Sequence, residues 1–421
     1  MRQGEIDAVR SYAQGLLRTN LKRGHDLTIG YRYSYLCPSP RKYRWQWFWD
    51  SCFHAVVMAH VAPEQATAEL KTLVAGQDAD GFIGHMTFWG SRFWGLSNLA
   101  GYAQSRPGER LRHSALIQPP MLAQAVERVG EVVGDPAFAP QFMEPLDRYH
   151  EWLAENRAPD GDGLLVIVSP FESGIDHSPT FDAPLGVTGK PGPFGLGVRD
   201  RWLDVRNWLN SYGSARMLRA AHFYVKDALV NALYAESLET MARLHRAQMN
   251  PASAETYAQR ARLVTGSLVD KLLDRSYGAF FSLIGKQELR SAQLTVAGLM
   301  PLVIEGLPQD VAGELVERHL QTRNQFWTRY PVPSVAASEP AFDPRDGSLT
   351  WRGPTWVNTN WLLWRGLRRH GFEELAAQLA ARTITMVAEA GLREFYNPLN
   401  GEGNGASSFG WSALALDMAE G

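Results

Sequence analysis

The sequence predicts a single all-α domain of helical hairpins, six of which can close into an (α/α)6 toroid. Apolar residues recur every three to four positions in about twelve segments, which is the periodicity of amphipathic or buried helices. The segments arrive in adjacent pairs, with Gly, Pro, Asn or Asp at the joints and few strand-like alternations between them. No internal repeat and no low-complexity linker divides the chain. We therefore expect a single large domain over residues 1–421.

The predicted helices fall into two groups. The first group covers residues 8–21, 51–62, 64–73, 117–133 and 138–156. The second group covers residues 226–248, 251–273, 291–304, 308–321, 355–370, 372–390 and 411–419. Three other segments, 78–108, 160–203 and 325–353, lack helical periodicity and are rich in Gly, Pro and aromatic residues. Long irregular segments in a compact domain usually carry function, so we expect lid-like loops around one mouth.

Composition excludes several classes of protein. The chain has 42 Lys and Arg against 44 Asp and Glu, a formal net charge of −2, so a general nucleic-acid binder is not expected. No run of about 18 apolar residues is present to span a membrane, and the first ten residues mix charges of both signs. The only cysteines, Cys37 and Cys52, form neither a disulfide framework nor a CxxC pair. We therefore expect a cytoplasmic protein.

Aromatic residues surround the first candidate site. The chain contains 14 Trp, and residues 43–54 read YRWQWFWDSCFH. Tyr43, Trp47 and Trp49 could form a platform for the apolar face of a sugar ring, with Asp50 accepting hydrogen bonds from its hydroxyls. The alternative is that Asp50 only caps the helix that follows. The sequence leaves both interpretations open.

The second candidate is the loop SPFESGIDHSP at residues 169–179, which places Glu172 and Asp176 four positions apart. Carboxylates in such loops commonly cap turns. If Asp176 is buried beside Phe171 and Ile175, desolvation would raise its pKa and suit it to be a general acid.

The third candidate is LREFYNPLNGEG at residues 392–403. Its glycines allow the backbone to approach a ligand closely. Glu394 is flanked by large apolar groups, whereas Glu402 lies in the Gly-rich turn and is expected to be solvated.

Other chemistries lack their motifs. The sequence contains no HExxH, no GxxxxGK[ST], no GxSxG and no strand-helix GxGxxG. His54 and His60 are six positions apart and do not form the i, i+4 pair of a helical zinc site. Neither a metal nor another cofactor is predicted.

Taken together, these segments resemble glycoside hydrolase family 63, and in particular its compact bacterial branch of mannosylglycerate and glucosylglycerate hydrolases. The resemblance is distributed in order along the chain, through WFWDSCFHA (47–55), DGFIGHM (80–86), IQPP (117–120), ESGIDHSP (172–179), DALVNALYAESL (227–238), WRGPTWVNTNW (351–361) and EFYNPLNGEG (394–403). It implies an (α/α)6 toroid and an inverting mechanism.

The resemblance also implies roles for individual residues. Asp176 corresponds to the general acid and Glu394 to the base that activates water. Trp47, Trp49, Asp50, Gln118 and Trp356 resemble residues of the sugar pocket, and Tyr43 is expected at its rim.

The compact branch implies a small α-glycoside substrate, α-mannosylglycerate or α-glucosylglycerate. The glycerate carboxylate should meet an arginine, because a guanidinium matches a carboxylate bidentately. Arg216 and Arg219 are the candidates, with Arg201 as a further choice. Arg352 is instead expected to form an ion pair beneath the pocket floor.

Three alternatives stay open at this level. The chain could be a general α-glucosidase on short gluco-oligosaccharides, a sugar epimerase with a histidine pair, or a non-catalytic sugar-binding protein on the same fold. A homo-oligomer is also an open possibility, and the choice between mannose and glucose depends on the contacts of one hydroxyl.

Overall fold

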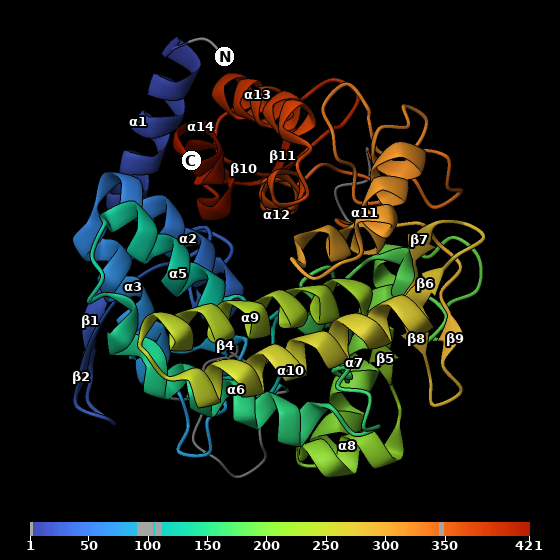
Figure 1. Ribbon diagram of the computed structural model, residues 1–421, viewed down its shortest axis with the longest axis horizontal. Coiled ribbons are helices and arrows are strands. Elements are labelled where there is room, and N and C mark those ends of the chain that lie inside the picture. Colours follow the sequence, from blue (N-terminus) through green and yellow to red (C-terminus); the bar gives the residue numbers. More distant parts are fainter. Residues whose placement is uncertain (1–2, 91–103, 106–111, 345–348) are drawn as a thin grey trace.

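The computed structural model describes residues 3–90, 104–105, 112–344 and 349–421, and its architecture is mainly helical (Figure 1). The α-helices are α1 Gln3–Thr19, α2 Phe48–Val61, α3 Pro63–Ala75, α5 Leu122–Val133, α6 Met143–Arg157, α7 Pro193–Leu209, α8 Ser214–Ala220, α9 Ala228–Ala247, α10 Pro251–Ser267, α11 Gln309–Leu315, α12 Val357–Arg369, α13 Glu373–Ala390 and α14 Ala415–Glu420. Short 3-10 or π segments include Ala139–Phe142, Pro170–Ser173, Pro179–Phe181, Leu268–Leu272, Val296–Val303, Val316–Leu320 and Gly410–Leu414.

The expected helical hairpins are present. Helices α2 and α3, α9 and α10, and α12 and α13 are consecutive in the chain and pack against each other. Their joints contain the expected breakers, with Pro63 at the start of α3 and Gly371 in the left-handed region before α13. Helix α1 packs against α13 and α14, so the two ends of the chain lie side by side (Figure 1). One buried apolar cluster extends from Val9 in α1 to Met418 in α14.

The strands are short and lie between the helices. They are β1 Leu21–Asp26, β2 Tyr31–Leu36, β3 Gln46–Trp47, β4 Met86–Thr87, β5 Val225–Lys226, β6 Leu273–Asp274, β7 Ala279–Phe280, β8 Leu283–Ile284, β9 Leu289–Arg290, β10 Arg393–Tyr396 and β11 Gly403–Ser407. The pairs β1-β2, β3-β4, β6-β7 and β10-β11 are antiparallel, and β5-β8-β9 forms a three-stranded sheet. The β10-β11 hairpin carries Glu394, one of the two carboxyls that the sequence analysis predicts to be catalytic.

Two predictions about regular structure were wrong. The irregular segment expected over residues 160–203 ends in helix α7, which continues to Leu209. Its two internal glycines and its mixed face of Trp, Asp and Arg obscured the helical pattern. The helix expected over 291–304 is reduced to a 3-10 segment, Val296–Val303, that contains Pro301, which has no backbone N–H to donate.

Aromatic residues in the expected lid-like loops are already packed into the protein body. Phe82 lies 4.7 Å from Trp152 between ring centroids, and the Trp89 indole donates a hydrogen bond of 2.5 Å to Gln46 Oε1. Phe88 and Phe181 are also buried. These four side chains therefore need no ligand to cover them, whereas Phe93 and Trp94 lie outside the described residues.

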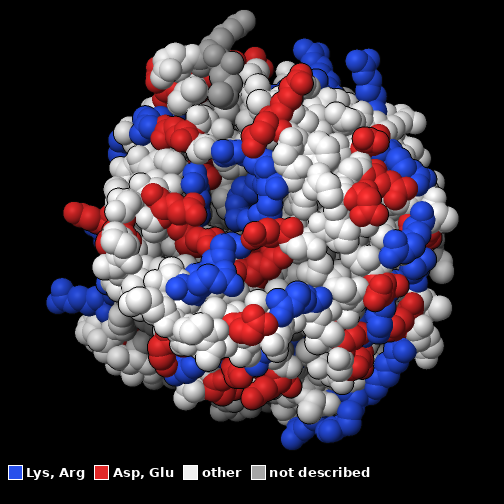
Figure 2. All heavy atoms as spheres, in the orientation of Figure 1, with Lys and Arg blue, Asp and Glu red and all other residues white. Residues whose placement is uncertain are grey.

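Charged side chains of both signs are mixed across the face of the molecule in Figure 2. This distribution agrees with the near-neutral composition. In the part of the chain that the structure describes, no helix combines the length and hydropathy needed to cross a membrane.

Candidate active site

One pocket gathers residues from all three candidate segments. Its lining is Pro38, Tyr43, Trp47, Trp49, Asp50, Gln118, Gly174, Asp176, Thr350, Trp351, Trp356, Glu394, Phe409 and Trp411. The structure thus brings together both expected catalytic carboxyls and six expected sugar-binding residues, although they are spread over most of the sequence.

Glu394 is fixed by the β10-β11 hairpin and is surrounded by hydrogen-bond donors. The Tyr43 hydroxyl donates to Glu394 Oε1 at 2.7 Å, and the backbone N–H of Ala406 donates to Oε2 at 2.8 Å. The Lys42 ammonium lies 3.2 Å from Oε2. Gly405, with φ of +69°, makes room for this arrangement, because a Cβ there would lie 2.7 Å from Oε2. Three donors around two acceptor oxygens favour an ionised carboxylate.

Asp176 belongs to a loop that is anchored by its neighbour Glu172. The Glu172 carboxylate is fully buried and pairs with both Nη atoms of Arg157, at 2.8 and 2.6 Å. It also accepts hydrogen bonds from the backbone N–H groups of Ile117 and Val168. Glu172 therefore holds the loop in place, while Asp176 faces the pocket.

A glycine allows this loop to approach the aromatic wall. Gly174 has φ of +72°, and a Cβ at this position would lie 2.4 Å from Cζ2 of Trp49. Any side chain at residue 174 would displace either the loop or the indole. The motif ESGID thus combines an anchor, a close backbone contact and the pocket carboxyl.

The electrostatics separate the two candidate catalytic groups. Burial raises the pKa of Asp176 to about 7, with the negative charges of Asp200 and Glu394 acting in the same direction and Lys42 acting against them. Burial also raises the pKa of Asp50 well above its usual range, and burial with the Glu394 charge raises the pKa of Tyr43. Near neutral pH, Asp176 can therefore hold a proton.

Asp50 does not cap a helix. Helix α2 begins at Phe48, so Asp50 lies in its first turn, and the N-cap residue Trp47 makes no side-chain cap. The Asp50 side chain is buried and lines the pocket. The capping alternative is therefore wrong, and a pocket carboxyl is what the structure contains.

The walls are aromatic. Trp351 stacks on Trp356 with ring centroids 3.8 Å apart, and Trp356 also contacts Trp411 at 5.7 Å. Gln118 accepts a hydrogen bond of 3.0 Å from the Trp49 backbone N–H through Oε1. Trp351, Phe409 and Trp411 were not among the predicted site residues, although they lie in or beside the quoted motifs. An aromatic count in WRGPTWVNTNW would have indicated Trp351, whereas Phe409 and Trp411 follow the last motif.

The expected arginines do not line the pocket. Arg216 and Arg219 are exposed on α8, and neither is among the described lining residues. Arg201 pairs with Asp204 at 3.0 Å on α7. Arg352 forms the expected ion pair, with Asp182, through an Nη1–Oδ2 contact of 3.0 Å. The structure therefore leaves the partner of a substrate carboxylate without an assigned residue.

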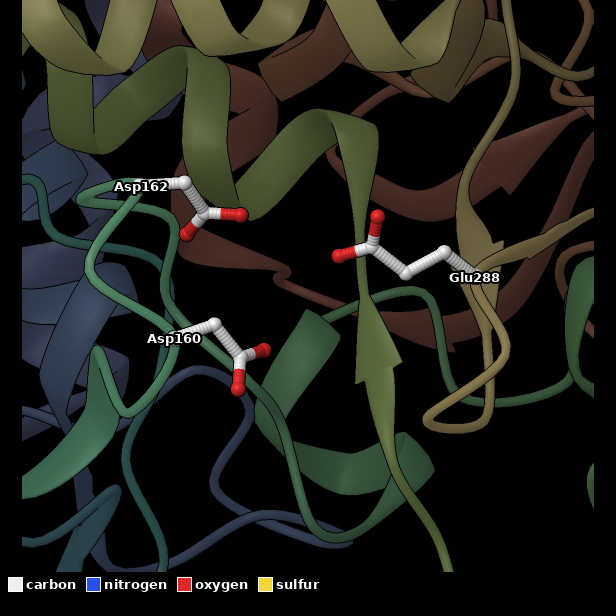
Figure 3. A group of neighbouring side chains, drawn as sticks. All are labelled: Asp160, Asp162 and Glu288. Atoms are coloured by element: carbon white, nitrogen blue, oxygen red, sulfur yellow. The ribbon is translucent and has the colours of Figure 1, made fainter.

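A second group of carboxyls lies away from the pocket. Asp160, Asp162 and Glu288 turn their oxygens toward one another (Figure 3), which is the spacing of a candidate cation site. The Lys226 ammonium pairs with all three, at 2.8 Å from Asp160 and 2.6 Å from Asp162, and Lys271 pairs with Asp162 and Glu288. The two ammonium groups therefore lie among the carboxyls and offset two of the three negative charges.

Comparison with known proteins identifies the family of this chain. The family model of the mannosylglycerate hydrolase MGH1-like glycoside hydrolase domain matches residues 43–412. A mannosylglycerate hydrolase of Thermus thermophilus is 32% identical over 91% of this chain and 96% of its own length. A glucosylglycerate hydrolase of Mycolicibacterium hassiacum is 27% identical over 94% and 95%.

Solved structures of glycoside hydrolases are also similar to this chain. The crystal structure of a GH63 mannosylglycerate hydrolase from Thermus thermophilus, in complex with Tris and D-glycerate, has a TM-score of 0.84, 30% identity and coverage of 97% of this chain and 99% of that one. The neutral trehalase Nth1 of Saccharomyces cerevisiae, at 17% identity and a TM-score of 0.59, shares the fold alone.

The predicted all-α toroid is confirmed by these matches, and the fold together with the carboxyl-bearing pocket defines a glycosidase. The chain belongs to the MGH1-like glycoside hydrolase family.

Proposed function

We propose that this glycosidase hydrolyses a small α-glycoside of glycerate with inversion at the anomeric carbon. Asp176 donates its proton to the glycosidic oxygen as the C–O bond breaks. Glu394 removes a proton from a water that attacks the opposite face of the sugar ring. The products are a free hexose and glycerate, and each catalytic carboxyl then returns to its starting protonation state by exchange with solvent.

The main support is the opposite environment of the two carboxyls in one pocket. Burial raises the pKa of Asp176 to about 7, whereas the Glu394 oxygens accept from Tyr43, Ala406 and Lys42. One group is suited to give a proton and the other to take one, which is what inversion requires.

The substrate class rests on the relatives. Two of them are named mannosylglycerate hydrolase and glucosylglycerate hydrolase, and a structural relative is described with D-glycerate bound. The aromatic walls formed by Trp47, Trp49, Trp351 and Trp356 suit the C–H face of a hexose, and Asp50 and Gln118 supply polar contacts for its hydroxyls.

Proton NMR of product formation tests the proposal. Mannosylglycerate, glucosylglycerate, kojibiose and trehalose are supplied separately, and the anomer of the first hexose released is recorded. We expect rapid cleavage of a glycosyl-glycerate with β-hexose appearing first. Faster cleavage of kojibiose or a longer α-glucan would favour the general α-glucosidase, and α-hexose appearing first would exclude inversion.

The pH profile gives a second test. Because the acid must be protonated, activity should fall as the pH rises through the pKa of Asp176, about 7. An alkaline limb above pH 9 would contradict the assignment of Asp176 as the acid.

Location in the cytoplasm is part of the proposal and is supported by the buried, free thiols of Cys37 and Cys52. Association into a homo-oligomer stays a prediction, which light scattering of the purified protein measures directly.

A further inference from the structure

Helix α7 exposes large apolar side chains and buries both of its carboxyls. The six large apolar side chains that it exposes form the α7 stripe, which consists of Phe194, Val198, Trp202, Val205, Trp208 and Leu209. Phe194 is 86% exposed, Leu209 69% and Trp202 57%. At about 3.6 residues per turn, the six positions fall on one side of the helix, and the buried Asp200 and Asp204 lie off that side. A continuous apolar side that faces solvent marks a docking surface.

Part of the α7 stripe is hollowed into a groove. Its lining consists of Phe194, Gly197, Val198, Arg201, Trp202 and Val205. Gly197 adds no side chain to the groove, and a Cβ at this position would have no heavy atom within 4 Å. A second helix can therefore approach α7 closely at this point.

The arginines beside the α7 stripe already have partners in their own chain. Arg201 pairs with Asp204 at 3.0 Å. The guanidinium of Arg206 lies 5.4 Å from the ring centroid of Trp202. The surface that α7 leaves without a partner in the described residues is therefore apolar, and its occupant has to offer an apolar surface rather than carboxyls.

The order of side chains in the α7 stripe is self-complementary for an antiparallel pair of helices. Phe194 and Leu209 are equally far from the middle of the helix, between residues 201 and 202, and so are Val198 and Val205. When two copies run in opposite directions about a two-fold axis at this middle, Phe194 of one copy is level with Leu209 of the other. Val198 is likewise level with Val205, and the two Trp202 side chains flank the axis. Each large side chain thus meets an apolar counterpart.

We propose that α7 is the interface of a homodimer in which two copies of the helix pack antiparallel. Such an interface is isologous, because the same surface of both copies takes part. The proposal names the surface through which the expected homo-oligomer forms. It does not depend on the substrate or on the roles of Asp176 and Glu394.

The exposed area of the α7 stripe fits a reversible dimer. If a large apolar side chain has roughly 150–250 Å² of surface, the exposed fractions of the six amount to on the order of 600 Å² per copy. Two copies would then bury about 1,200 Å², which is the lower end of the range for specific interfaces. We therefore expect a dissociation constant in the micromolar range.

The response to salt separates a second copy from an acidic partner or an anionic lipid surface. Arg199 and Arg206 are seven residues apart and lie along one edge of the α7 stripe. The two-fold axis places these edges of both copies on the same side, so four guanidinium groups line one rim of the dimer. Because salt screens their repulsion, raising sodium chloride from about 50 to about 500 mM should strengthen the dimer. Attachment to an anionic surface would weaken under the same change.

Sedimentation equilibrium without substrate, between roughly 1 and 200 μM protein, tests the interface through Leu209→Lys and Leu289→Lys. The two leucines are 69% and 65% exposed, so the changes match in chemistry and exposure, but Leu289 lies on β9. We expect Leu209→Lys to raise the dissociation constant at least about tenfold and Leu289→Lys to change it less than about twofold. A monomeric wild-type protein at the highest concentration, or equal dissociation constants in the two variants, would overturn the proposal.

Cysteine cross-linking tests the antiparallel arrangement. The natural thiols of Cys37 and Cys52 are buried, so a short bis-maleimide reports on introduced cysteines. A mixture of Val198→Cys and Val205→Cys should cross-link severalfold faster than either variant alone, because equal positions on the two copies are offset by about 10 Å along the helix. Faster cross-linking of Val198→Cys with itself would overturn the proposal. So would a monomer that binds vesicles of anionic phospholipid and loses this binding in Leu209→Asp but not in Leu289→Asp.

Discussion

The β10-β11 hairpin and the loop of residues 169–179 each bring one carboxyl to the same pocket, but they treat it in opposite ways. On the hairpin, Glu394 receives hydrogen bonds from Tyr43 and Ala406 and lies beside Lys42. In the loop, Arg157 and the backbone N–H of Val168 donate hydrogen bonds to Glu172. The Asp176 carboxyl receives no hydrogen bond from another described residue.

This difference is consistent with the proposed roles of Asp176 as the acid and Glu394 as the base. Three donors surround Glu394, whereas burial raises the pKa of Asp176 to about 7 although its own backbone N–H donates to it. The ion pair that anchors the loop of residues 169–179 is made by Glu172, four residues before Asp176. One residue therefore holds the loop in place, and a different one is the proposed proton donor.

Exchanging the two carboxyls for amides should give the largest effect. We expect Glu394→Gln and Asp176→Asn each to lower turnover of a glycosyl-glycerate by roughly 10²–10⁴-fold, because proton transfer is lost. The comparison is sharpened by a glycosyl fluoride, which should restore turnover in Asp176→Asn but not in Glu394→Gln. Glu402→Gln, an exposed position in the same hairpin, is the control and should retain wild-type activity.

Removing the Arg157–Glu172 ion pair, which anchors the loop of residues 169–179, should give the second-largest effect, a loss of stability. Arg157→Met leaves the buried Glu172 carboxylate without its partner, and we expect a loss of about 3–5 kcal/mol in the free energy of unfolding. Urea denaturation measures this change. Arg260→Met removes the more exposed pair with Glu151 and should cost at most about 1 kcal/mol. Equal losses in the two variants would mean that the Glu172 pair is not a special anchor.

Asp50→Asn should separate ligand binding from folding. If Asp50 accepts hydrogen bonds from sugar hydroxyls, its loss should lower kcat/KM roughly 10- to 150-fold, the equivalent of about 1.5–3 kcal/mol, with little change in melting temperature. Cys52→Ala, in the same helix but packed in the core, should show the reverse pattern. A variant at residue 50 that melts early but keeps full kcat/KM would show that the role of Asp50 is structural.

Tyr43→Phe tests the donors around Glu394 and should give the smallest effect. The change removes the 2.7 Å hydrogen bond to Oε1 but keeps the ring contacts with Trp47 and Phe409. We expect kcat to fall about tenfold, the equivalent of a hydrogen bond to a charged group. Steady-state kinetics measure it, and an unchanged kcat would mean that Ala406 and Lys42 suffice to orient the base.

Prediction from sequence succeeded where the signal is local. Helical periodicity located α2, α9, α12 and α13 to within a few residues. Sequence motifs selected Asp176, Glu394 and the tryptophans that now line one pocket. Helix prediction from periodicity failed at α7. An apolar side of this helix faces outward and its carboxyls face inward, whereas periodicity analysis assumes the opposite arrangement.

By itself, the sequence determined the helical hairpins, the absence of common nucleotide, metalloprotease and serine-hydrolase motifs, and the choice of candidate carboxyls. Only the tertiary structure decided what each carboxyl does. Glu172 and Asp176 are four residues apart in one loop, yet Arg157 reaches the first, whereas burial raises the pKa of the second. Arg157 comes from helix α6, and protonation depends on distance and burial, which adjacency in the chain does not specify.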